Sequence, residues 1–195
     1  MSSPVTQAAG ARGRILDSPA QITLVLGASF FVALCAHIYL PLPGTPVPLT
    51  LQNFGVLLVG LSLGSRRGFA ALALYLVEGM LGMPVFSPHG LGGIAQIVGP
   101  TGGYLIAYPF VAGMTGYIFE RGKATFARAA FASLAGEILL FTFGISWLYF
   151  LTHSLAQAIA FGLSWFVFAE VIKIMMAAGA MKSWRSFFPL NNERI

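Results

Sequence analysis

Residues 78–104 read EGMLGMPVFSPHGLGGIAQIVGPTGGY and lie between two long apolar runs. Seven glycines and three prolines fall between Gly82 and Tyr104, and a helix loses about 1 kcal/mol for each glycine and about 3 kcal/mol for each proline relative to alanine. A stable helix is therefore not expected in this stretch. Irregular backbone beside a bilayer persists only where protein or water satisfies its amide groups. The stretch is either a flexible connector or an ordered loop that lines a ligand cavity.

The composition of the whole chain indicates an all-α integral membrane protein. Of the 195 residues 57% are hydrophobic and 9% are charged, with a mean hydropathy of +0.81, whereas an average soluble domain is about 25% charged. The net charge is +5, and the eleven Lys and Arg residues lie in short patches between apolar runs. Membrane orientation explains these patches better than nucleic-acid binding does. The single cysteine, Cys35, excludes a disulfide framework and a Cys-rich metal site.

Six transmembrane helices are predicted from the apolar runs and the charges between them. The expected spans are 22–40, 51–63, 69–83, 104–119, 129–151 and 166–187, with an additional outer helical segment at 155–163. In this arrangement every basic cluster except Lys173 is cytoplasmic, and so are both termini. The second and third spans are shorter than the roughly 20 residues of a full crossing. Their outer ends should stop below the surface and leave a recess that the loops fill.

The regions outside the spans complete the predicted organisation. Residues 1–20 are expected to form a disordered cytoplasmic tail, 21–188 a six-helix membrane domain and 189–195 a second cytoplasmic tail. Arg12 and Arg14 before an apolar run resemble a cleaved signal, but the run is long enough to cross a bilayer, so an uncleaved first span is predicted. Residues 40–48 hold four prolines and no charge. This segment should be an extended loop that contributes to an ordered extracellular cap.

Charged residues inside the spans are the candidates for chemistry. Glu170 and Lys173 are spaced i, i+3 on one helix face, and they form either a structural ion pair or a receptor for an acidic ligand. Glu78 and Glu137 stand alone in their spans, and each is interpreted as protonated, or as hydrogen-bonded to helix neighbours or a coupling partner, rather than as catalytic. The three histidines have no metal-binding spacing, and no P-loop or nucleophile motif occurs. No metal, no cofactor and no enzymatic activity are therefore expected.

Four motifs in combination resemble the BioY family. They are PVPLTLQ at 46–52, YLVEGMLGMPVF at 75–86, GPTGGYL at 99–105, and the E-x-x-K pair of Glu170 and Lys173. The resemblance extends over residues 22–187. It implies the biotin-binding substrate (S) component of an energy-coupling-factor (ECF) transporter in the cytoplasmic (inner) membrane of a prokaryote. The implied partners are a transmembrane T component and two cytoplasmic ABC-type ATPases, and the loop between the first two helices would close the biotin pocket.

The resemblance also implies which residues contact the ligand. Lys173 would meet the biotin carboxylate with Glu170 beside it, and some relatives carry a loop arginine where this chain offers only His89. Biotin further requires aromatic walls for its bicycle and polar partners for its ureido group. The predicted contacts are Lys173, Glu170, Gln52, Thr50, Phe86, His89, Gln96, Thr101, Gly102, Gly103, Tyr104 and Trp165.

Small residues on the first helix, including Ala28, Ser29 and Ala33, form a smooth face. Such a face permits close packing, either inside the bundle or against another subunit, and the resemblance favours a face for the coupling subunit. Three other functions stay open. The chain could be an S component for another small vitamin, a membrane enzyme that uses Glu78, Glu137 or His153, or a purely structural subunit.

Overall fold

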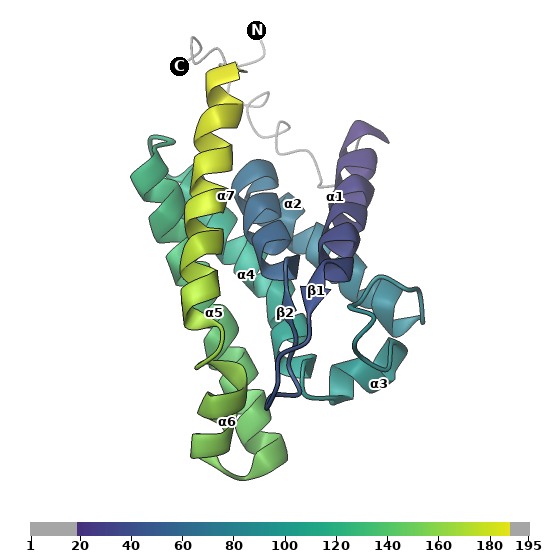
Figure 1. Ribbon diagram of the computed structural model, residues 1–195. Helices are drawn as coiled ribbons and strands as arrows, with labels where there is room; N and C mark the ends of the chain where they lie inside the picture. The colour runs from purple at the N-terminus through teal and green to yellow at the C-terminus, as the bar shows by residue number, and fades with distance from the viewer. Residues whose placement is uncertain (1–18, 188–195) are drawn as a thin grey trace, which may run out of the picture.

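The computed structural model describes residues 19–187, which form an all-α fold with one short hairpin of strands (Figure 1). This confirms the predicted fold class. The predicted tails lie outside the described residues, except that the first helix already begins at Pro19. The helices are α1 Pro19–His37, α2 Gln52–Met80, α3 Gly93–Val98, α4 Gly102–Glu120, α5 Phe126–Thr152, α6 Leu155–Gly162 and α7 Val167–Phe187, and the strands are β1 Tyr39–Leu40 and β2 Leu49–Thr50.

Helix α2 folds back on itself at Gly64. This residue has φ +79° and ψ −178°, outside the helical region, so two helical arms meet there. A Cβ built on Gly68 would lie 3.3 Å from the Cα of Gly60, whereas eight residues of a straight α-helix span about 12 Å. The two arms therefore pack side by side and correspond to the predicted second and third spans. Together with α1, α4, α5 and α7 they make the six predicted helices.

Length and apolarity vary among these helices. In the described part of the chain, α1 and α5 are each long and apolar enough to cross a membrane, α2 is so only when its two arms are counted together, and α6 with α7 would make a further span bent by 46°. The bend lies between Gly162 and Val167, at the break predicted from Gly162 and Ser164. The two arms of α2 are each shorter than a full crossing, as predicted.

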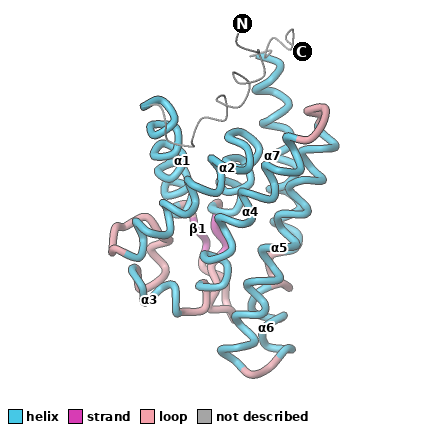
Figure 2. The backbone as a smooth tube through the Cα atoms, turned by 180° about the vertical axis from the view of Figure 1, so that it is seen from behind, coloured by secondary structure: helices cyan, strands magenta, loops and turns pink. Residues whose placement is uncertain are grey.

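The connections separate into two groups at opposite ends of the bundle. Figures 1 and 2 show the start of α1, the end of α7 and the α4–α5 connection at one end, with the hairpin, α3 and α6 at the other. The turn of α2 belongs to the first end, because the backbone N–H and the hydroxyl of Ser65 each donate to the Glu120 carboxylate at 3.0 Å. The basic connections and the ligand pocket described below are thus at opposite ends.

The glycine-rich stretch is ordered, and it contains a helix that the sequence did not predict. Gly92 and Gly93, with φ of +70° and +58°, begin the six-residue α3, and the backbone N–H of Gly92 donates to the Gln96 side chain. Trp147 of α5 donates to the carbonyl of Gly99, the C-cap of α3, at 2.9 Å. These tertiary contacts outweigh the poor helix propensity of the segment.

Candidate ligand-binding pocket

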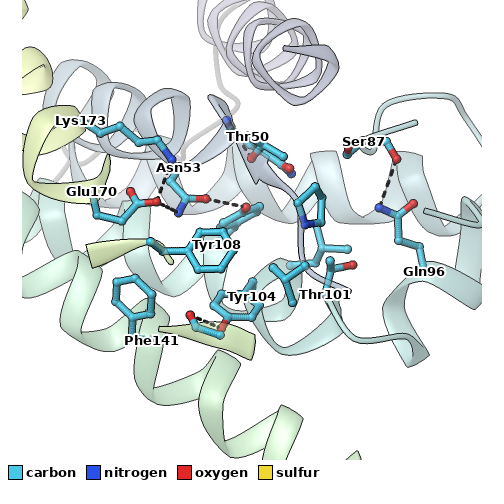
Figure 3. A pocket seen from close by; sticks show the side chains of 16 residues that line it. Thr50, Asn53, Ser87, Gln96, Thr101, Tyr104, Tyr108, Phe141, Glu170 and Lys173 are labelled. Carbon is cyan, nitrogen blue, oxygen red and sulfur yellow. Dashed lines mark hydrogen bonds and ion pairs between the residues drawn. The ribbon is translucent and has the colours of Figure 1, made fainter. Parts of the chain in front are cut away.

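A pocket lies at the hairpin end of the bundle, among α2, α4, α5 and α7 (Figure 3). Its empty volume, including the solvent at its mouth, is ≈ 490 Å³. The lining combines one cation, one carboxylate, amides, hydroxyls and aromatic rings. The lining residues are Val47, Pro48, Thr50, Gln52, Asn53, Ser87, Gln96, Thr101, Tyr104, Leu105, Tyr108, Phe141, Gly162, Phe166, Glu170 and Lys173.

One end of the pocket holds a buried ion pair within a chain of hydrogen bonds. Lys173 Nζ lies 2.7 Å from Glu170 Oε1, and the two side chains are only 8% and 4% exposed. The amide of Asn53 donates to the same Glu170 oxygen at 3.1 Å, and the Tyr108 hydroxyl donates to Asn53 Oδ1 at 2.9 Å. The i, i+3 spacing on α7 brings the charges together, while Asn53 and Tyr108 fix the carboxylate from α2 and α4. An ammonium has three donors, so Lys173 can bind an anion without leaving Glu170.

The opposite end of the pocket is polar and uncharged. In Figure 3, Ser87 and Gln96 lie across the pocket from Lys173, with Tyr104 and Tyr108 between the two ends. Gln96 Nε2 donates to the Ser87 carbonyl at 3.4 Å. The Ser87 hydroxyl is buried without a hydrogen-bond partner. A buried hydroxyl that lacks a partner is costly, and a polar ligand group in the pocket would supply one.

Aromatic side chains form the wall between the two ends. Tyr104 donates its hydroxyl to the Gly162 carbonyl at 2.9 Å, which fixes the ring against α6. The ring of Phe141 meets the Tyr104 ring edge-on at 6.5 Å between centroids. Phe166, in the turn before α7, also faces the pocket. This wall can hold a flat, apolar ring system between the charged and the uncharged end.

The proline-rich loop between β1 and β2 covers the pocket. The strands pair Tyr39 with Thr50, and the loop places Val47 and Pro48 in the lining. At its tip the Thr45 hydroxyl donates to the Phe161 carbonyl of α6 at 2.7 Å and accepts from Val47 N–H at 3.1 Å. The loop is thereby tied down as a lid, which agrees with the predicted ordered cap.

The sequence profile of the BioY family matches residues 7–189. The chain belongs to the BioY family. It is 35% identical over 155 residues to the protein named biotin transporter BioY of Thermotoga maritima, covering 80% of this chain and 90% of that one. It is 36% identical over 166 residues to the biotin transporter BioY of Rhizobium etli, covering 80% and 88%. A crystal structure of the S component for biotin from an ECF-type ABC transporter has the same fold, with a TM-score of 0.77 over 95% of each chain at 22% identity.

This BioY-family chain brings most of the predicted contact residues into the pocket. The predicted residues that line it are Lys173, Glu170, Gln52, Thr50, Gln96, Thr101 and Tyr104. They come from α7, the hairpin, the start of α2, the glycine-rich stretch and the start of α4. Gln52 is additionally held by its hydrogen bond to the Tyr75 hydroxyl at 2.7 Å.

Five predicted residues lie outside the lining, each for a local reason. Phe86 is buried behind it, edge-on against Tyr75, and Trp165 is 52% exposed on the outer surface. Gly102 and Gly103 lie in tight packing, where a Cβ on Gly102 would collide with the Ile97 carbonyl of α3 and a Cβ on Gly103 with Trp147 of α5. His89 borders a neighbouring hollow that shares Pro48, Gln96 and Thr101 with the pocket.

Asn53 and Tyr108 are pocket residues that the sequence reasoning missed. Both were detectable as extensions of predicted positions, since Asn53 follows Gln52 directly and Tyr108 lies four residues after Tyr104 on the same helix face. The residues of the predicted coupling face also pack within the chain. Ala28, Ser29 and Ala33 are buried in a bundle where α1 packs on α2, and the Ser29 hydroxyl donates to Glu78. A contact of this face with a coupling subunit stays a prediction.

Proposed function

We propose that this chain binds biotin and mediates its uptake as the substrate-specific component of an ECF-type transporter. The observation that carries the proposal is the placement of the buried Lys173 ammonium at one end of a pocket whose other end is polar and uncharged. Biotin has matching parts, namely a carboxylate tail and, at the far end, a ureido group. The named relatives are transporters rather than enzymes, in agreement with the expected absence of catalysis.

The pocket suggests how each part of biotin is held. The carboxylate accepts a charge-assisted hydrogen bond from Lys173. The bicycle lies against Tyr104, Phe141 and Phe166. The ureido group has two N–H donors and one carbonyl acceptor, and the unpartnered hydroxyl of Ser87 can accept from it or donate to it.

We infer that the chain lies in the cytoplasmic (inner) membrane of a prokaryote. The pocket then faces the outside, and both termini lie in the cytoplasm. Arg66 and Arg67 follow the α2 turn, and Arg121 and Lys123 occupy the α4–α5 connection. These residues mark their end of the bundle as cytoplasmic by the positive-inside rule. A membrane T component and two cytoplasmic ATPases would then act from that side.

Cysteine labelling of intact cells tests this orientation, because the native Cys35 is buried. A membrane-impermeant maleimide should label His89→Cys, an exposed position at the pocket end, and should leave the exposed Lys123→Cys unlabelled until the cells are opened. The reverse pattern would overturn the inferred topology.

Binding to the purified chain tests the function. Isothermal titration with biotin should give saturable binding with one site per chain, and mass spectrometry of ligand extracted from the purified protein should find biotin. A different small vitamin in that extract, with no biotin binding, would assign the chain to another substrate. No ligand at all would favour a purely structural subunit.

A further inference from the structure

Beneath the pocket, a second carboxyl group lies next to the ion pair of Glu170 and Lys173. Glu137 of α5 is 3% exposed. Its carboxyl group faces α7, within hydrogen-bonding reach of Glu170 and close enough to Lys173 to interact electrostatically. Neither oxygen of Glu137 has a hydrogen-bond donor, and Glu170 Oε2 also lacks one.

Two ionised carboxylates cannot satisfy each other, because each is only an acceptor. If both glutamates were ionised, one lysine would have to balance two buried negative charges, and an uncompensated buried charge is strongly unfavourable. A single proton removes both problems. It turns Glu137 into a donor toward Glu170, and it leaves the Glu170–Lys173 pair neutral as a whole.

We propose that Glu137 and Glu170 form a carboxyl dyad that binds one proton, and that this proton and an anionic ligand at Lys173 favour each other's binding. The second part rests on the proposed function of the pocket. A ligand carboxylate at Lys173 adds negative charge beside the dyad, which strengthens the hold on the proton. By reciprocity, loss of the proton creates a second carboxylate that competes for Lys173 and weakens the ligand.

Other ionisable and polar groups packed around Glu137 do not supply the missing donor. Tyr108 of α4 interacts electrostatically with Glu137, and the hydroxyls of Thr115 of α4 and Ser133 of α5 are buried and likewise without partners. In the described part of the chain, the ionisable groups that interact with Glu137 are Glu170, Lys173 and Tyr108.

Infrared difference spectroscopy tests the bound proton directly. The spectrum of the original chain at neutral pH should contain a protonated-carboxyl band that is absent from Glu137→Gln. The variant should still fold, because glutamine has the same shape and its amide can donate to Glu170 as the proposed acid does. The matched control is Glu78→Gln, in which the band should remain. If the original chain lacks the band, or if the band survives Glu137→Gln, there is no proton on Glu137 and the proposal is overturned.

Biotin titrations from pH 6 upward test the linkage. The affinity of the original chain should fall by up to about tenfold per pH unit across the range in which the infrared band disappears, since one proton is released. Glu137→Gln should lack this fall. A fall that is identical in the two proteins, or loss of the band without any fall, refutes the linkage. Absence of biotin binding at every pH would refute the proposed function instead and leave the infrared result standing.

Discussion

The lid of the pocket makes a quantitative prediction through Thr45. Its hydroxyl connects the loop tip to α6 and also accepts from Val47 N–H, so Thr45→Val removes two hydrogen bonds without changing the side-chain shape. Each such bond contributes about 1 kcal/mol net. The bond from Val47 lies within the loop and persists when the lid opens, so the closed lid should lose only the bond to α6, about 1 kcal/mol, which shifts its opening equilibrium by about fivefold.

The predicted consequence is kinetic. A ligand that leaves through the opened lid should dissociate up to about fivefold faster, and its association rate should not fall, because the lid opens more readily. Stopped-flow displacement of a fluorescent biotin derivative measures both rates. The matched control is Thr142→Val, because the Thr142 hydroxyl bonds only to the Ile138 carbonyl of its own helix. An unchanged dissociation rate in Thr45→Val, or an equal increase in Thr142→Val, would refute the role of the lid.

Two further predictions concern the bundle itself. Gly64→Ala should lower the thermal unfolding midpoint, because a Cβ at φ +79° is strained and would collide with the Glu120 carboxylate, whereas Gly179→Ala, with open space around it, should not. Ala33→Trp should destabilise the chain and impair biotin binding, because Ala33 is buried in the bundle. The control Phe30→Trp, on the exposed side of α1, should do neither. Intact biotin binding in Ala33→Trp would instead indicate that this face of α1 contacts a coupling subunit.

The helices and the ion pair were predictable because their signals are local. Apolar runs and basic connections mark the spans. Opposite charges at i, i+3 on one helix contact each other regardless of which helices surround them. The position of Asn53 in the pocket could not be predicted from local sequence alone. A polar side chain in an apolar run faces the pocket, another helix or the lipid according to how its helix is rotated, and that rotation is set by neighbouring helices.

Tertiary contacts also explain the other differences. Helix α3 forms in a glycine-rich segment because Trp147 and the Gln96 side chain satisfy its ends. The small residues of α1 were assigned to a coupling subunit, but the same pattern permits close packing inside one chain, and only the position of α2 distinguishes the two. Phe86 was expected in the pocket from its place in a motif, whereas its ring fills the space above Gly79.

The central claim is that Lys173 holds the carboxylate of the ligand, and a double-mutant cycle with biotin and biotin amide tests it most directly. A charge-assisted hydrogen bond contributes roughly 1.5 to 3 kcal/mol, so Lys173→Ala should weaken biotin by about tenfold to a hundredfold. Biotin amide should bind weakly to the original chain and lose little more in the variant, because both changes remove one interaction. Equal weakening of acid and amide by Lys173→Ala would show that the Glu170–Lys173 pair is only structural and would contradict the claim.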